Sequence, residues 1–247
     1  MSYRALNASE IVKTISVLEH RINERFPRSG LTAVCHELLN VGEATQRNAQ
    51  AIAVPNLWLR GLIYVAIIAG IGGLVVVAQA IIQSINVQVG TEVFGFFQGI
   101  DAAMNITVLV GAALFFAVSF DDRMKRRRAL SELHVFRSIA HVIDMHQLTK
   151  DPSVVLGHYH ATATSPKRIM NRFELTRYLD YCSEMLALTG KLATLYAQSL
   201  PDQVVIDAVN DIEILTANLS GKIWQKITIL ESLEEKEDQR TPSLQRS

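Results

Sequence analysis

Two long stretches without a charged side chain constrain the fold of this sequence more than any other feature. Leu62–Thr91 and Ala102–Phe120 contain no Asp, Glu, Lys or Arg, although charged residues make up 19% of the chain. A helix needs about 20 apolar residues to cross the hydrocarbon core of a bilayer. Neither stretch has the polar stripe of an amphipathic soluble helix. We therefore predict an all-α integral membrane protein with two transmembrane helices, Leu62–Ile82 and Ala102–Phe120.

Basic residues near the ends of these two segments indicate the topology. They stand before the first segment and directly after the second, whereas Gln83–Ile100 between the segments has no Lys or Arg. Basic residues favour the cytoplasmic side. We expect a multi-pass protein of the inner (cytoplasmic) membrane with both termini in the cytoplasm. The run after the second segment serves as a topological anchor and is suited to anionic lipid head groups. The basic residues at the segment ends are Arg60, before the first segment, and Arg123, Lys125, Arg126, Arg127 and Arg128, after the second.

The remaining chain is typical of helices joined by short turns, and we predict four parts. Residues 1–56 form a cytoplasmic hairpin of helices 8–26 and 30–53. Residues 57–122 form the two-helix transmembrane domain, with an outside loop at 83–100 that allows a short re-entrant or surface helix near 91–99. Residues 123–234 form a cytoplasmic domain with a stalk helix followed by helices 166–200 and 202–234, and residues 235–247 form a mobile tail. Ser165 as cap and Pro166 at the first helical position predict the start of helix 166–200.

An apolar seam runs along the last predicted helix at a heptad-like spacing. Its members from Val205 to Leu233 are mostly aliphatic, which favours an antiparallel hairpin with helix 166–200 or a coiled coil between subunits. Two cysteines, Cys35 and Cys182, lie on different predicted helices and in no metal-binding or redox pair. In a reducing compartment we expect them to be buried thiols.

Small residues recur along the first membrane segment at spacings that allow close helix packing. The pairs are Ala66/Gly70 and Ala69/Gly73. Such spacing lets two helix backbones approach closely inside a bilayer. The partner is either the second segment of the same chain, near Gly111, or a segment of another subunit.

An acid stands at the predicted outer end of the second membrane segment. Asp101 is followed one helical turn later by Asn105. One interpretation is a helix-capping carboxylate at the interface, favoured by the helix dipole. The other requires an oligomer, in which copies of Asp101 and Asn105 form a cation-attracting ring at the mouth of a pore. We expect Thr107 and Ser119 at other angles, so that no polar stripe follows the full segment.

Histidines mark one face of the stalk helix. His134, Arg137, His141 and Asp144 fall within a sector of about 80°. We expect a hydrogen-bonded polar face, packed between subunits or against helix 166–200, which titrates near neutral pH. We predict no metal site, because His146 lies about 140° away from His141.

Motifs of catalysis and cofactor binding are absent from the sequence. It contains no GxSxG, HExxH, GxGxxG or GxxxxGK[ST], so we predict no enzyme and no cofactor. The 24 basic residues balance the 24 acidic ones, which argues against a nucleic-acid partner.

Three segments resemble a set of small bacterial two-span inner-membrane proteins. They are HVIDMHQLTKDP (141–152), RFPRSGL (25–31) and PNLWLR (55–60). The resemblance implies a bacterial cytoplasmic membrane and a helical cytoplasmic body, and it carries no catalytic residue with it.

Two spans enclose little space, so transport would require assembly, most simply as a cyclic homo-oligomer. The leading hypothesis is an oligomeric pore or ion-channel-like protein in the lipid bilayer, with a cytoplasmic gating or assembly domain. The alternatives are a membrane-anchored scaffold that binds a cytoplasmic protein, and a stress or defence effector that permeabilises the membrane.

Overall fold

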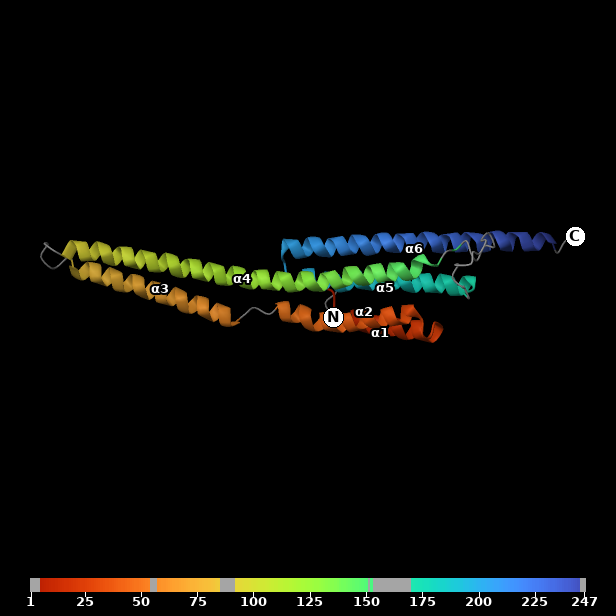
Figure 1. The fold of residues 1–247 in the computed structure, drawn as a ribbon, viewed down its shortest axis with the longest axis horizontal. Coiled ribbons are helices and arrows are strands. Elements are labelled where there is room, and N and C mark those ends of the chain that lie inside the picture. The colour runs from red at the N-terminus through yellow and green to blue at the C-terminus, as the bar shows by residue number, and fades with distance from the viewer. Residues whose placement is uncertain (1–4, 54–56, 85–91, 151, 153–169, 245–247) are drawn as a thin grey trace. The chain divides into compact units, whose positions relative to one another are not determined.

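The computed structural model describes residues 5–53, 57–84, 92–150, 152 and 170–244 (Figure 1). It divides the chain into two units, one of residues 1–53 with 128–247 and one of residues 54–127. The fourth helix belongs to both units. The helices are α1 (Ala8–Arg25), α2 (Gly30–Ala53), α3 (Leu57–Ser84), α4 (Glu92–Leu148), α5 (Arg172–Ser199) and α6 (Gln203–Leu244).

Helix α5 is the centre of the first unit, which we call the body. It packs against α1, α2 and α6, and α4 reaches it through Phe136, whose ring centroid lies 6.2 Å from that of Tyr196. Buried residues occur around the whole circumference of α5 between Leu175 and Tyr196. A helix that is buried on all sides needs neighbours on all sides. The body is therefore a bundle built around α5 (Figure 1).

The predicted N-terminal hairpin matches the structure closely. In α1, Ile11, Ile15, Leu18 and Ile22 are buried at helical spacing, and Asn7 caps the helix by accepting a hydrogen bond from the Ser9 amide at 3.0 Å. The turn to α2 places Arg28 in the left-handed region, with φ of 59°. This conformation is uncommon for a residue with a Cβ atom.

The predicted start of helix 166–200 differs from the structure. Residues 153–169, with Ser165 and Pro166, lie outside the described residues. Helix α5 begins at Arg172, and its cap is Asn171, which forms a capping box with Glu174. Asn171 Oδ1 accepts from the Glu174 amide at 2.8 Å, and Glu174 Oε2 accepts from the Asn171 amide at 2.9 Å. Two satisfied backbone donors fix the helix start here.

The end of α6 and the start of α4 also differ from the predicted positions. Helix α6 continues to Leu244, through most of the segment that we predicted as a mobile tail. Helix α4 begins at Glu92, so the expected short helix near 91–99 forms its first turns instead. The part of the predicted outside loop between the helices, residues 85–91, lies outside the described residues.

The apolar seam of α6 packs within the chain. Val205, Val209, Ile212, Leu219 and Ile223 are buried, and α6 packs on α5 more extensively than any other described helix pair. Thr194 of α5 donates to Glu213 of α6 at 2.8 Å. The intramolecular hairpin is therefore confirmed.

Both cysteines are free and buried in the body, as predicted. Burial raises the pKa of the Cys35 thiol to about 12, helped by the carboxylates of Glu19 and Glu184. Burial also raises the pKa of Cys182 to about 12, against the opposing charges of Lys150 and Lys226. Both side chains are accordingly thiols, which pack as small apolar groups.

The observed cap of α5 predicts that the side chain of Asn171, and not that of Ser165, stabilises the fold. Replacing Asn171 with Ala removes the capping box and should lower the free energy of unfolding by about 1 kcal/mol. The matched control is Ser165→Ala, at the cap predicted from sequence, which should change it by less than about 0.5 kcal/mol. Denaturant titration followed by circular dichroism measures both. An equal loss in the two variants would contradict the assigned helix start.

The raised thiol pKa values predict slow alkylation of the folded body. With a pKa near 12 in place of 9.0, the thiolate fraction of each cysteine at neutral pH falls about a thousandfold. Iodoacetamide should therefore modify both cysteines only after unfolding in denaturant, which mass spectrometry resolves by site. Rapid modification of either cysteine in the native protein would show that its helix packing is open.

Candidate functional site

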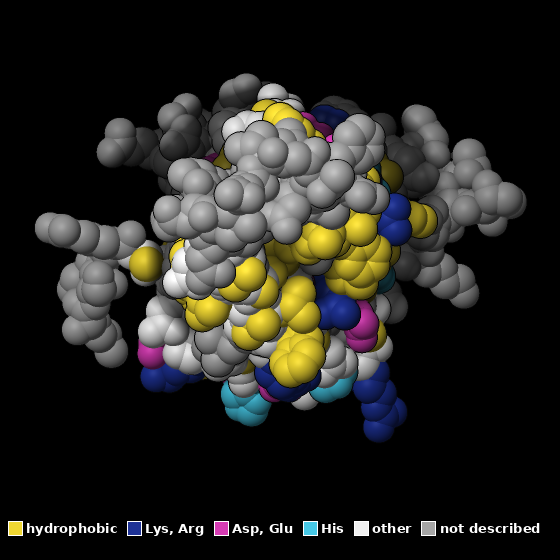
Figure 2. All heavy atoms as spheres, turned by 90° about the vertical axis from the view of Figure 1, so that its left-hand side faces the viewer, with side chains coloured by type: hydrophobic (Ala, Val, Ile, Leu, Met, Phe, Trp, Pro, Cys, Tyr) yellow, Lys and Arg dark blue, Asp and Glu magenta, His cyan; other side chains and the backbone are white. Residues whose placement is uncertain are grey.

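The membrane-length part of α4 is apolar and uncovered. Within the described residues, one helix is long and apolar enough to cross a membrane, namely Gly99–Leu148 with a best window of mean hydropathy 2.0, none of it buried. Val108, Leu109 and Phe116 are 70%, 72% and 72% exposed. In α3 the described apolar stretch is the shorter Gly61–Gly73. Figure 2 shows hydrophobic side chains gathered on the surface at the α3–α4 end.

The small residues of α3 and α4 line one groove between these two helices. The groove has a volume of about 820 Å³ and includes all five residues that the spacing marked for helix packing. A Cβ atom added to Gly70, Gly73 or Gly111 would meet no described atom within 4 Å. The small residues thus share a groove within one chain, but at these glycines the two helices do not approach closely. The five are Ala66, Ala69, Gly70, Gly73 and Gly111.

Polar residues of α4 lie on the face opposite this groove. The groove-lining side of α4 includes Ile106, Thr107, Val110 and Leu114. At 100° per residue, five others point within about 25° of the opposite direction. We call these five the α3-distal face. They are Asp101, Asn105, Ala112, Ser119 and Arg123.

The expectation for Ser119 is therefore wrong. Ser119 follows Asp101 by about five full helical turns, which returns it to the same angle. Thr107 does lie at another angle and lines the groove. Along the apolar segment, three of the four polar residues thus share one face, from Asp101 through Asn105 to Ser119.

Asp101 and Asn105 contact each other at one end of the α3-distal face. Asn105 Nδ2 donates to Asp101 Oδ2 at 3.5 Å, and both side chains are exposed. The two residues thus form a small polar pair on an otherwise apolar surface. An acid at the centre of a bilayer would cost roughly 2.5–3.5 kcal/mol on insertion scales, and less near its edge.

Aromatic side chains and Arg123 surround a hollow at the other end of the same face. Its volume is about 520 Å³, and its lining includes Phe115, Phe116, Ser119, Phe120 and Arg123. The aromatic rings of Phe115 and Phe116 meet edge to face, with centroids 6.3 Å apart. The α3-distal face therefore has an acidic end at Asp101, a small apolar residue, Ala112, in its middle, and a basic end at Arg123 with aromatic side chains beside it.

The basic run after the apolar segment contains an ion pair with the preceding helical turn. Lys125 Nζ lies 2.8 Å from Asp121 Oδ2, whereas Arg123, Arg127 and Arg128 are exposed. The side chain of Arg60 lies outside the described side chains. An anchoring role for this run stays a prediction.

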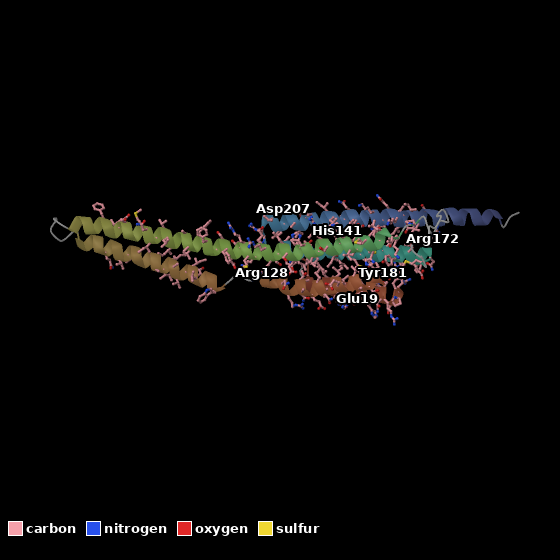
Figure 3. All side chains as sticks on the ribbon, in the orientation of Figure 1. Glu19, Arg128, His141, Arg172, Tyr181 and Asp207 are labelled. Carbon is pink, nitrogen blue, oxygen red and sulfur yellow. The ribbon has the colours of Figure 1, made fainter. Side chains whose placement is uncertain are left out.

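The polar face of the stalk helix is in the body but does not pack against α5. His134 and His141 are exposed, and Arg137 Nη2 lies 3.6 Å from Asp211 Oδ2 of α6. Asp144 Oδ1 accepts from Gln147 Nε2 at 2.6 Å. The expected contact with helix 166–200 is therefore wrong, because the opposite side of α4, with Phe136, faces α5. Figure 3 labels His141 on α4 and Tyr181 on α5.

Two groups of contacts in the body have no local signal in the sequence. Gln147 is buried, and Lys226 of α6 donates to its side-chain oxygen at 2.7 Å and to its backbone oxygen at 3.0 Å. Four cations also stack on aromatic rings near the start of α5. The pairs are Arg21 and Arg177 with Tyr181, Arg25 with Phe173, and Lys150 with Tyr178.

The contacts described above are packing contacts, hydrogen bonds, ion pairs and cation–π contacts. Among the described residues, no group of three His, Cys, Asp or Glu side chains is placed to hold a metal ion. Comparisons with protein-family models, curated proteins and solved structures find no match. The bacterial resemblance given above thus rests on its three sequence segments alone.

Proposed function

We propose that the chain assembles as a homo-oligomeric, two-span membrane pore in which the α3-distal face of α4 lines the axis. In this arrangement α3 lies outside α4, and the helical body carries out gating or assembly on the cytoplasmic side. The observation that carries the proposal is the position of Asp101, Asn105, Ser119 and Arg123, which share the face of α4 that points away from the α3 groove.

The energetics of burial in lipid support this arrangement. A monomer would expose Asp101 and Asn105 to lipid head groups or tails, and polar side chains in membrane helices normally face protein or a water-filled cavity. Turning the α3-distal face toward a symmetry axis provides that environment in every subunit. The groove with Gly70, Gly73 and Gly111 then accepts a helix of a neighbouring copy, since small residues allow close approach.

The distribution of charge along the face suggests how such a pore would select ions. Rings of Asp101 attract cations at the outer mouth. Phe116, at the edge of this face near its basic end, forms a narrow apolar section that can exclude water. The permeation path therefore has charged ends and an apolar constriction.

The pore proposal predicts oligomers and cation-selective currents that depend on Asp101. Native mass spectrometry in detergent should give three or more copies, and the reconstituted protein should conduct. Asp101→Asn should reduce the cation-to-anion permeability ratio by a factor of about two to five, the equivalent of 0.5–1 kcal/mol. Unchanged selectivity in Asp101→Asn would remove Asp101 from the path.

Cysteine accessibility tests the assigned face directly. In Ser119→Cys, a positively charged methanethiosulfonate reagent should reduce the current, because this position faces the axis. The matched control is Thr107→Cys in the same helix, which lines the α3 groove and should be insensitive. The native cysteines are buried and give little background. Block of Thr107→Cys with Ser119→Cys unaffected would contradict the assigned lining.

A membrane-anchored scaffold is the second candidate, and exposed apolar residues on α6 favour it. Ile214, Trp224 and Ile229 are 60%, 53% and 47% exposed on the body, a kind of surface that often binds a protein partner. A monomer or dimer that carries no current would support this function over the pore.

A further inference from the structure

The ring of His146 lies directly on the first residue of α2. A Cβ atom built on Gly30 would be 2.5 Å from His146 Cε1 and 3.3 Å from Nδ1. This separation is far below a van der Waals contact between carbon atoms, so a side chain at position 30 would require the ring to move. The contact joins the end of the stalk helix α4 to the start of α2, within the body.

The surroundings of His146 disfavour a positive charge. Burial lowers the pKa of His146 below its ordinary value of 6.5, and the nearby ammonium group of Lys150 lowers it further. The first turn of α2 contains no acidic residue. Its amino end is the positive end of the helix dipole, where the Thr32 amide donates to the Ser29 hydroxyl at 3.2 Å.

Charged and titratable groups on the other neighbouring elements give no compensation. The turn before α2 carries Arg28, α5 contributes Tyr178 beneath the Lys150 ammonium group at 4.8 Å, and α6 contributes Lys226, which is bonded to Gln147. The carboxylate nearest in sequence, Asp144, is bonded to the Gln147 amide. Among the described residues, no acid is positioned to stabilise an imidazolium at His146.

We propose that His146 is an acid-sensitive latch that holds the start of α2 against the stalk helix α4 and releases it when the imidazole is protonated. The neutral ring packs on Gly30 and completes the contact. The imidazolium ion places a positive charge against the amino end of α2 and beside Lys150, and the contact opens. The α1–α2 hairpin would then loosen at its turn end while the α5–α6 hairpin stays intact.

The direction of the pH effect follows from the two protonation states. Because the folded state holds His146 at a lowered pKa, the unfolded or opened state binds the proton more tightly. The contact therefore keeps its full strength above about pH 6.5 and weakens as the pH falls below it. Acid conditions favour release, and alkaline conditions favour the closed latch.

Hydrogen exchange of the full-length protein in detergent, from about pH 8 to about pH 5, tests the latch. After correction for intrinsic exchange rates, amides of Leu31–Leu38 should lose protection on acidification by a factor on the order of ten, whereas those of α5 should not. In His146→Gln the pH dependence should vanish. The matched control His141→Gln, on the exposed side of the same helix, should keep it.

A second variant separates the contact from general stability. Gly30→Ala places a Cβ against the ring and should lower protection of Leu31–Leu38 already at about pH 8, while Gly30→Ala with His146→Ala should restore it. Retention of the pH response in His146→Gln would overturn the proposal. So would its loss in His141→Gln, or full protection in Gly30→Ala.

Discussion

The apolar surface of α4 is the constraint on which the rest of the architecture depends. A segment of mean hydropathy 2.0 with none of its best window buried is unstable in water, because each exposed aliphatic or aromatic side chain forgoes about 1.5–3 kcal/mol of burial. A bilayer would provide an apolar environment for the apolar sides of this helix. Hydrocarbon is a poor environment for Asp101 and Asn105, and for this reason the proposed function places these two side chains at the axis of an oligomer.

The body differs from the apolar part of α4, because its apolar side chains are buried against one another within the chain. Helix α5 supplies buried residues on every side, and α1, α2, α4 and α6 each cover part of it. Polar contacts such as Gln147 with Lys226 are satisfied inside this packing, which fixes how α4 and α6 align. The body therefore has a defined structure of its own.

Sequence reasoning predicted the elements with a strong hydrophobic period. The α1–α2 hairpin and the seam of α6 follow from apolar spacing, which depends only on local chemistry, whereas the buried thiols were predicted from the compartment and the lack of a cysteine pair motif. The helix starts were harder, because Ser165-Pro166 and Asn171 with Glu174 are both good start signals, and tertiary packing of Leu175 and Tyr178 accompanies the second. The contact of His146 with Gly30 joins positions far apart in the chain, and no pattern in one sequence predicts it.

The candidate site was predictable in part. Asp101 and Asn105 stand out as polar residues in an apolar helix, whereas the shared angle of Ser119 follows only from counting turns along it. Which side of α4 remains open depends on where α3 lies, and the groove residues are needed for that. The polar pair of Asp101 and Asn105 was therefore predictable, and the full α3-distal face was not.

The most direct test of the account is the sidedness of the chain in a membrane. Single cysteines at Ser9, Gln88 and Ser232, in a background with Cys35 and Cys182 replaced by Ala, can be labelled in intact cells with a membrane-impermeant maleimide. We predict labelling of Gln88→Cys from outside, and labelling of Ser9→Cys and Ser232→Cys only after the membrane is permeabilised. Labelling of Ser9→Cys or Ser232→Cys from outside, or recovery of the chain in the soluble fraction without detergent, would contradict the two-span arrangement.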